Sequence, residues 1–184
     1  CLLSRGLGDV YKRQELHNSF LDTLMICFSH KLYPIPLYAI LIFFLYKKYN
    51  WKNLIFILIP TITLMIIIAD FTASSIFKPW IERLRPCHEP SLNVYLANGC
   101  GGKFGFFSSH ASNTFAAAIF IILHLKDKYK HIKWLILWAA VTAFSRVYLA
   151  VHYPTDILTG AFYGSLVGFL CYISSKKIIT KNSL

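Results

Sequence analysis

The sequence predicts an all-α integral membrane protein, a helical bundle of five or six transmembrane helices preceded by an amphipathic helix. Of its 184 residues 56% are hydrophobic, and the mean hydropathy is +0.52. A soluble domain of this size cannot bury so much apolar surface in one core. Lipid offers no water to backbone groups, so we expect the spanning segments to be helices.

Five apolar stretches account for the expected spans. The longest, residues 53–77, is enough to cross about 30 Å of hydrocarbon at about 1.5 Å per residue. A shorter stretch at 33–46 contains two prolines, so a buried or re-entrant segment is the alternative there. The remaining stretches lie near residues 110–125, 134–151 and 157–175.

The segment before these stretches has its own apolar pattern. Residues 15–30 place four apolar side chains at four-residue spacing: Leu16, Phe20, Leu24 and Phe28. This spacing suits an amphipathic helix lying at the membrane interface. An extension of the first span fits the same residues equally well.

Residues 1–14, CLLSRGLGDVYKRQ, match neither pattern. The last six letters, DVYKRQ, resemble the translated end of a sequencing adapter. We therefore expect residues 1–14 to be non-native. Residues 15–184 are then expected to form a single membrane domain with its core motifs at 78–156.

The chain is basic, with a formal net charge of +11, and its lysines gather at the borders of the apolar stretches. Three clusters are formed by Lys47, Lys48 and Lys52; by Lys126, Lys128, Lys130 and Lys133; and by Lys176, Lys177 and Lys181. Because Lys and Arg accumulate on cytoplasmic loops, five spans place all three clusters inside. We expect a bacterial inner-membrane protein whose loops at 78–105 and 152–156 face the periplasm or exterior. No nucleic-acid motif accompanies the lysines, so no nucleic-acid partner is expected.

Three groups of polar residues interrupt the apolar chain, and the predicted topology brings them to one membrane surface. They are Lys78 with Arg85-Pro86, then Ser108-Ser109-His110, then Ser145-Arg146 with His152 and Asp156. Charges at the ends of packed helices must face a wet cavity, each other or a ligand. Three cations with few carboxylates nearby predict an anionic ligand.

The cations and serines suit a phosphate. Arg85 and Arg146 carry planar forks that match phosphate oxygens, and Lys78 adds a compact point charge. Ser108 and Ser109 precede an apolar helical run, which suits an N-cap where backbone N–H groups receive an anion.

Two histidines and a carboxylate would complete a phosphoryl-transfer site. His152 can attack phosphorus as a neutral imidazole, while Asp156 holds its other nitrogen. His110 can protonate the leaving oxygen. This chemistry needs neither a metal nor a cofactor.

These groups resemble the three-part signature of the type 2 phosphatidic acid phosphatase family, the membrane lipid phosphatases related to the vanadium haloperoxidases. The first part of the signature is a Lys followed after six residues by Arg-Pro, and it is matched from Lys78 to Pro86. The third part is Ser-Arg, then His after five residues and Asp after three more, and it is matched from Ser145 to Asp156. The middle part, usually Pro-Ser-Gly-His, is Phe-Ser-Ser-His here, with Ser109 in place of Gly. The resemblance covers roughly residues 50–175.

The resemblance implies a role for each matching residue. His152 would be the nucleophile that forms a phosphohistidine, Asp156 its partner and His110 the general acid. The phosphate would be bound by Lys78, Arg85, Ser108, Ser109 and Arg146. The implied substrate is a membrane lipid phosphate or diphosphate, with undecaprenyl diphosphate as the leading case.

Several alternatives are compatible with the same residues. Phosphatidic acid, phosphatidylglycerophosphate and lipid A present the same phosphate chemistry. Transfer of the phosphoryl group to a second lipid, in place of water, is a further alternative. A non-enzymatic transporter or scaffold would use the charges as an ion pathway or a packing network.

Polar residues outside the signature are interpreted more simply. Glu82 and Arg83 match no family position and are taken as solvated loop charges. Asp70 lies within the longest apolar stretch, where it is either functional or bonded to a Ser or Thr of another helix. Cys87 and Cys100 both lie in the loop at 78–105, called the outer loop below, and form either a disulfide or two free thiols. No metal-ligand spacing is present, so no metal is expected.

Overall fold

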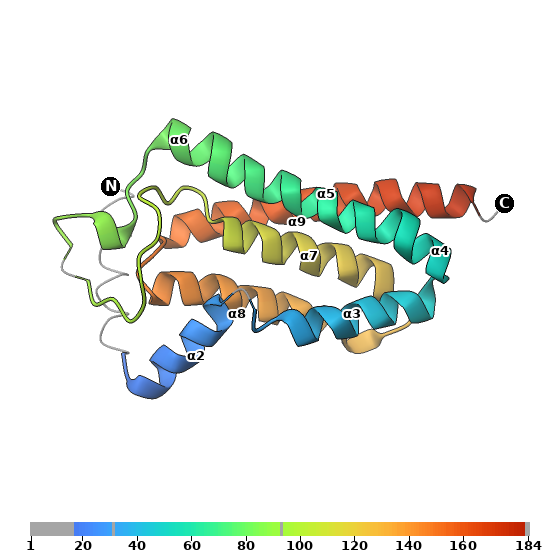
Figure 1. Cartoon of the computed structure of the whole chain (residues 1–184), viewed down its shortest axis with the longest axis horizontal. Coiled ribbons are helices and arrows are strands. Elements are labelled where there is room, and N and C mark those ends of the chain that lie inside the picture. Colours follow the sequence, from blue (N-terminus) through green and yellow to red (C-terminus); the bar gives the residue numbers. More distant parts are fainter. Residues whose placement is uncertain (1–16, 31, 93, 183–184) are drawn as a thin grey trace.

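The computed structural model describes residues 17–30, 32–92 and 94–182, and helices provide the regular structure of these ranges (Figure 1). Within these ranges, the one regular pairing outside the helices is an isolated β-bridge between Leu84 and Phe104. The all-α prediction is confirmed. The expected non-native segment 1–14 and the amphipathic-face residue Leu16 lie outside the described residues.

The helices follow the apolar stretches of the sequence. The principal elements are α2 (Ser19–Ser29), α3 (Ile35–Lys48), α7 (Ser109–Leu125), α8 (Leu135–Tyr148) and α9 (Pro154–Lys181). Between α3 and α7 one continuous helical run comprises α4 (Trp51–Asn53), η1 (Leu54–Leu58), α5 (Ile59–Phe71), η2 (Thr72–Phe77) and α6 (Lys78–Ile81). Short 3-10 turns, η3 (Pro86–His88) and η4 (Lys130–Trp134), complete the described elements.

Two of these helices are long and apolar enough to span a membrane by themselves. They are Trp51–Ile81, with 31 residues, and Pro154–Lys181, with 28 residues. Most of their apolar surface is not covered by the rest of the protein, since only 28% and 22% of their most apolar windows are buried. Such uncovered apolar helices are typical of contact with lipid.

The N-terminal helices are separate elements. Helix α2 begins after Asn18, whose side chain accepts a hydrogen bond from the Leu21 N–H, and it ends at His30. The next helix starts at Ile35, and its prolines stand only at its beginning. Proline is tolerated there because the first N–H groups of a helix have no acceptor within the helix. The interpretation of residues 15–30 as an extension of the first span is therefore wrong.

The end of the long helical run differs from expectation in one respect. Lys78 was expected in the outer loop, but it lies in the last helical turn, α6. The helix ends one turn later at Glu82, which takes a left-handed conformation with φ 51°. Lys78 is consequently held by a helix and not by a mobile loop.

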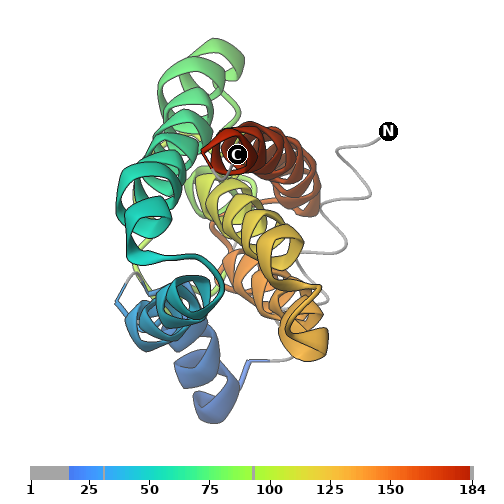
Figure 2. The same cartoon turned by 90° about the vertical axis from the view of Figure 1, so that its right-hand side faces the viewer.

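Helix α7 forms the centre of the bundle. It packs against α9, α8, α5 and α3, and Figure 2 shows it enclosed by these helices. Its buried face combines small residues with Phe120, Ile121 and Leu125, which belong to the main hydrophobic cluster. The three lysine clusters lie together at the end of the bundle where α3, α7 and α9 finish, opposite to the outer loop (Figure 1).

Three glycines allow α9 to approach α7 unusually closely. A β-carbon at Gly160 would lie 2.6 Å from the Ser108 carbonyl oxygen. β-Carbons at Gly164 and Gly168 would lie closer still to the carbonyl oxygens of Ser112 and Ala116. This four-residue repeat of glycine is the small-residue packing typical of membrane helices, and it lets the two backbones touch.

We expect Gly164→Ala to destabilise the bundle by about 1–3 kcal/mol, because the added methyl group must push two backbones apart. Thermal unfolding of the purified protein in detergent measures the effect. Gly99→Ala is the matched control, since its β-carbon would have no described neighbour within 4 Å. Equal stability of the two variants would contradict the close α7–α9 packing.

Candidate active site

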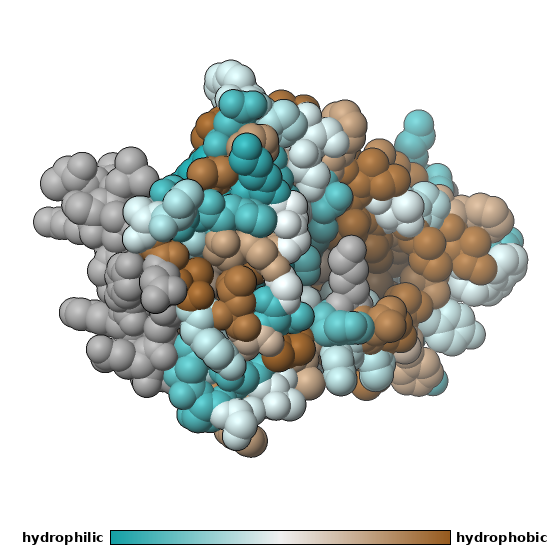
Figure 3. Space-filling model, turned by 60° about the vertical axis from the view of Figure 1, so that its left-hand side comes forward, coloured by the Kyte–Doolittle hydropathy of each residue, from teal (hydrophilic) through white to brown (hydrophobic). Residues whose placement is uncertain are grey.

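The three polar groups of the sequence converge at the outer-loop end of the bundle. Their residues come from α6, the loop after it, the first turn of α7, the end of α8, the turn after α8 and the first turn of α9. Electrostatic coupling links Lys78 to Arg85, Arg146 and Asp156, and His152 to Asp156 and both arginines. Figure 3 shows polar residues over this end of the molecule and apolar residues over its flank.

His152 and Asp156 form a buried pair. The His152 Nδ1 lies 3.6 Å from the Asp156 Oδ2, and the two side chains are 2% and 0% exposed. That distance is too long for a hydrogen bond, and Nδ1 has no hydrogen-bond partner among the described residues. Since Nδ1 faces the carboxylate, Nε2 is the ring nitrogen that remains for chemistry.

The environment keeps His152 neutral. Burial lowers its pKa to about 4, an effect that the Asp156 carboxylate opposes and Arg85 and Arg146 reinforce. A neutral imidazole at physiological pH has a lone pair available for attack on an electrophile. Asp156 would then stabilise the positive charge that such an attack creates on the ring.

Asp156 is held by more groups than the sequence indicated. Its Oδ1 accepts a hydrogen bond from Arg83 NH1 at 2.8 Å, and its Oδ2 accepts one from the Tyr153 N–H at 2.9 Å. Its carbonyl oxygen accepts the Ser108 N–H at 3.1 Å. Charge-assisted bonds of this kind fix the position of a carboxylate strongly.

The interpretation of Arg83 as a solvated loop charge is wrong. Its guanidinium also donates to the Thr155 Oγ1 at 2.8 Å and lies 4.1 Å from the ring centre of Tyr153. The reason is local: residues 83–85 are extended around the Leu84 bridge, and alternate residues of an extended segment share a face. The two-residue spacing from Arg83 to Arg85 is the signal that would have revealed this.

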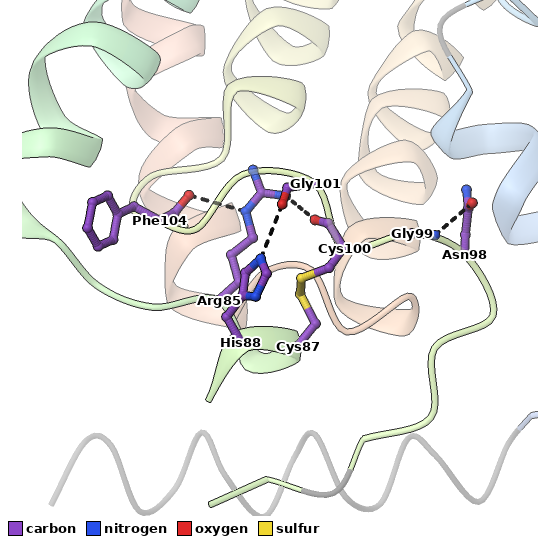
Figure 4. The surroundings of a disulfide bond; sticks show 8 residues. All are labelled: Arg85, Cys87, His88, Asn98, Gly99, Cys100, Gly101 and Phe104. Atoms are coloured by element: carbon purple, nitrogen blue, oxygen red, sulfur yellow. Dashed lines mark hydrogen bonds between the residues drawn. A yellow bond between two sulfur atoms is a disulfide. The ribbon is translucent and has the colours of Figure 1, made fainter. Parts of the chain in front are cut away.

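Arg85 is fixed by the outer loop (Figure 4). Its NH1 donates to the Cys100 carbonyl oxygen at 2.7 Å and its Nε to that of Phe104 at 3.2 Å. Cys87 and Cys100 form a disulfide that ties the loop back to the residues following Arg85. Burial lowers the Arg85 pKa, and Asp156 opposes this. Of the two alternatives for the cysteines, the disulfide is the one observed.

His88 completes a group of possible metal ligands with these cysteines. The three ligand atoms lie within 4.8 Å of one another. However, both sulfurs are committed to the disulfide, and the imidazole Nε2 lies 3.1 Å from the Gly101 carbonyl oxygen. A thiolate zinc site requires deprotonated cysteines, so this group does not fit one in its oxidised state.

Lys78 and the start of α7 are joined by serine hydroxyls. The Lys78 Nζ donates to the Ser109 Oγ at 2.9 Å and to the Ser74 Oγ at 3.3 Å. Ser109, which replaces the glycine of the resembled signature, therefore orients a cation. The predicted N-cap is confirmed at Ser108, whose Oγ accepts the Ala111 N–H at 3.4 Å.

Arg146 reaches the site from the end of α8. Its NH1 bonds to the Ser29 Oγ of α2, whereas its buried Nε has no hydrogen-bond partner within the described ranges. Its carbonyl oxygen accepts the N–H groups of Val151 and His152, both at 3.1 Å. The same residue thus supplies a donor for an anion and shapes the turn that presents His152.

Gly105 is a site residue that the sequence analysis did not identify. A β-carbon there would lie 3.2 Å from the Asp156 Oδ2, 3.3 Å from the Arg85 Cγ and 3.6 Å from the His152 Nδ1. Its lack of a side chain allows the outer loop to pass directly over the His152–Asp156 pair. No sequence pattern marked it, because the loop has three other glycines nearby.

His110 lines a cavity of about 490 Å³ that lies between α2, α3, α5, α7 and α8. Ser74, Ser109 and Asp70 also line it. Of the two alternatives for Asp70, a bond to a Ser or Thr is not the one observed, since its Oδ1 accepts a hydrogen bond from the Asn113 Nδ2 at 3.4 Å. The site therefore consists of a cationic cradle, a buried His–Asp pair and a second histidine facing a cavity.

Comparison with known proteins gives a family match and several similar proteins. The family model described as the PAP2 superfamily matches residues 61–179. A protein of Bacteroides thetaiotaomicron named lipid A 4'-phosphatase is 36% identical over 170 residues, which are 90% of this chain and 75% of that protein. A Bacillus subtilis protein named undecaprenyl-diphosphatase is 24% identical over 85% of this chain and 76% of its own.

A solved structure has the same fold. The crystal structure of a transmembrane PAP2 type phosphatidylglycerolphosphate phosphatase from Bacillus subtilis superposes with a TM-score of 0.73 at 23% identity. The match covers 96% of this chain and 87% of that chain. At this identity the likeness concerns the fold alone.

We expect Arg83→Gln to destabilise the protein by about 3 kcal/mol, because it leaves the buried Asp156 carboxylate without its cation. Unfolding in detergent at neutral pH measures the loss. Lys103→Gln removes an exposed charge from the same loop and is expected to change stability by less than about 0.5 kcal/mol. Similar stabilities of the two variants would show that Arg83 does not support Asp156.

The low pKa of His152 predicts a specific dependence of stability on pH. A folded pKa of about 4, below the ordinary value of 6.5, means that the unfolded chain binds the proton first. This contribution to stability is complete above pH 6.5 and is lost as the pH falls through 4. Melting temperatures from pH 7 to 4 should therefore decline less steeply in His152→Asn than in the unaltered protein.

His131→Asn is the control for this measurement, because His131 is exposed at the opposite end of the bundle. It should keep the original slope. A His152→Asn slope equal to that of the unaltered protein would contradict a buried neutral His152.

Proposed function

This chain belongs to the PAP2 superfamily, and from that premise we propose that it is a metal-independent membrane lipid phosphatase that works through a phosphohistidine intermediate. The observation that carries the proposal is the buried His152–Asp156 pair beneath Lys78, Arg85 and Arg146. Three cations bind and neutralise a phosphate, and a neutral imidazole lies among them as the nucleophile. The relatives are named as phosphatases, which supports a phosphoric ester hydrolase.

The first half of the reaction uses both histidines. The Nε2 of His152 forms a bond to phosphorus while the bond from phosphorus to the lipid oxygen breaks. His110, as the cation, gives its proton to that oxygen, so the product leaves as a neutral alcohol when the substrate is a monoester. Asp156 stabilises the charge on the phosphorylated imidazole, and Arg83 holds Asp156 in position.

The second half reverses the proton transfer. A water molecule attacks the phosphorus, and the neutral His110 takes its proton as the bond from phosphorus to Nε2 breaks. Inorganic phosphate leaves, and both histidines return to their starting states. Lys78, Arg85 and Arg146 offset the charge of the phosphoryl group in both steps, with the Ser109 hydroxyl orienting Lys78. We propose that the first backbone N–H groups of α7, which Ser108 precedes as the N-cap, also donate hydrogen bonds to the phosphate.

The proposed membrane arrangement has five spans. They are α3, the run from Trp51 to Ile81, α7, α8 and α9. The lysine clusters then lie on the cytoplasmic side and the active site on the periplasmic or external side of a bacterial inner membrane. Helix α2 lies at the outer interface, with Phe20 and Leu24 exposed toward lipid.

The substrate is proposed to be a lipid phosphate whose tails stay in the bilayer. The sequence alone placed undecaprenyl diphosphate first. The comparisons favour lipid A instead, since the relative with that name is 36% identical and the undecaprenyl-diphosphatase is 24% identical. Transfer to a second lipid and a non-enzymatic transporter or scaffold are the other candidates from the sequence, and neither has an observation in its favour.

Phosphate release by the purified full chain in the presence of a chelator tests the proposal. Lipid A, phosphatidic acid and undecaprenyl diphosphate are offered separately, and we expect His152→Ala to lower release by at least about 10⁴-fold. His131→Ala, a histidine change outside the site, should behave as the unaltered protein. Release that is independent of His152, or none from a folded protein with any lipid, would overturn the proposal.

A labelled intermediate gives a second readout. Lipid carrying radiolabelled phosphate, stopped during turnover, should leave an acid-labile and base-stable label on the unaltered protein and none on His152→Ala. Recovery of the label on an added acceptor lipid would instead identify a phosphotransferase.

A further inference from the structure

We propose that the cavity beside His110 is a binding site for the sugar ring that carries the substrate's phosphate. This inference rests on the phosphatase function proposed above and specifies its substrate as a phosphorylated glycolipid. The cavity measures about 490 Å³. Its position, its unpaired polar atoms and its connection to an apolar groove each support the inference.

The position follows from the role of His110. This histidine gives its proton to the oxygen that leaves phosphorus, so the group attached to that oxygen must lie on the His110 side of the phosphate. The cavity begins there, since Ser109 and His110 both line it. Asn113, one turn further along α7 on the same face, also lines it. Arg146 reaches its wall through Ser29.

The cavity contains buried polar atoms without partners. Thr142 is only 3% exposed, and its Oγ1 has no hydrogen-bond partner among the described residues. The Oδ1 of Asn113 is likewise buried and unpaired there, and its Nδ2 makes only a long bond of 3.4 Å to Asp70. Each such atom lacks a hydrogen bond until water or a ligand supplies one.

The remaining walls suit a ring with one polar edge and one apolar face. Thr142, Asn113 and Asp70 offer a hydroxyl, an amide and a carboxylate, which together donate to and accept from sugar hydroxyls. Tyr38 and Trp138 line the same cavity as an edge-to-face pair with centroids 5.9 Å apart. Their ring surfaces can cover the C–H groups of a sugar, a combination usual for ligand sites that are mostly apolar with a few placed polar groups.

An apolar groove adjoins the cavity. A second cavity of about 480 Å³ shares Tyr38 and Asn113 with the first and is otherwise lined mainly by aliphatic side chains of α3, α5 and α7, including Leu41, Ile62 and Met65. Phosphate, polar ring and acyl chain thus find a cation cradle, a polar cavity and an apolar groove in that order. A polyprenyl chain joined directly to its phosphates would place hydrocarbon against Thr142, Asn113 and Asp70, leaving them unsatisfied.

Two cavity variants test the inference. Thr142→Val keeps the side-chain shape and removes the hydroxyl, and Asn113→Leu removes the amide. We expect each to lower the ratio of kcat/KM for lipid A to kcat/KM for phosphatidic acid by about tenfold or more. Phosphatidic acid has no sugar ring, so its kcat/KM does not depend on contacts between a sugar and the cavity. Thr23→Val on the exposed side of α2 and Asn53→Leu in α4 are the matched controls, and both should keep the original ratio.

The outcomes separate the two proposals. An unchanged ratio in both cavity variants, or an equal loss with both lipids, would overturn the sugar site while leaving the phosphatase intact. If the unaltered protein releases phosphate from neither of these lipids nor from undecaprenyl diphosphate, the phosphatase proposal fails, and equilibrium binding of lipid A decides the inference. Weaker binding by Thr142→Val than by Thr23→Val would support the sugar site, and equal binding would overturn it.

Discussion

The contact between the backbones of α7 and α9 is the constraint on which the rest of the structure depends. Gly160, Gly164 and Gly168 leave no room for a side chain between the two helices, so neither helix can slide or rotate without a clash. The Ser108 N–H also bonds to the Asp156 carbonyl oxygen, which joins the first turns of the two helices directly. His110 on α7 is thereby placed at a defined height relative to Asp156 on α9.

The site built on this contact carries more positive than negative charge. Four cations, Lys78, Arg83, Arg85 and Arg146, meet at one end of the bundle, and Asp156 is held directly by only one of them. Partial burial makes the mutual repulsion of the others expensive, since little water screens it. Hydrogen bonds keep these cations in place: Lys78 donates to the hydroxyls of Ser109 and Ser74, and Arg85 donates to the Cys100 carbonyl oxygen in the disulfide-bonded loop. A phosphate would relieve that repulsion, which gives the ligand a share in the stability of the folded state.

The arrangement also explains how a membrane helix bundle can perform hydrolysis. The polar groups lie at helix ends and in the outer loop, where water has access, while the flanks remain apolar (Figure 3). The cavity beside His110 is lined by residues of α2, α3, α5, α7 and α8 and therefore lies between helices. Under the proposed function, a lipid would present its phosphate to the site from between the helices while its tails stay in the bilayer.

The sequence by itself determined the helical class, the approximate helix positions and the identity of the signature residues. Long apolar stretches and their prolines are local properties, and the spacings in Lys78 to Pro86 and Ser145 to Asp156 are readable without any fold. The N-cap at Ser108 could be predicted for the same reason, because capping depends on neighbouring residues alone.

Only the tertiary structure decided the role of Arg83, the closeness of Gly105 to the His152–Asp156 pair and the glycine contact between α7 and α9. Each joins residues that are distant in sequence: Arg83 and Asp156 are separated by 73 positions. It also decided that Lys78 belongs to a helix, since the long helical run continues past the point where its apolar pattern ends. Contacts of this kind depend on how helices pack, and a one-dimensional pattern of residue types does not contain that information.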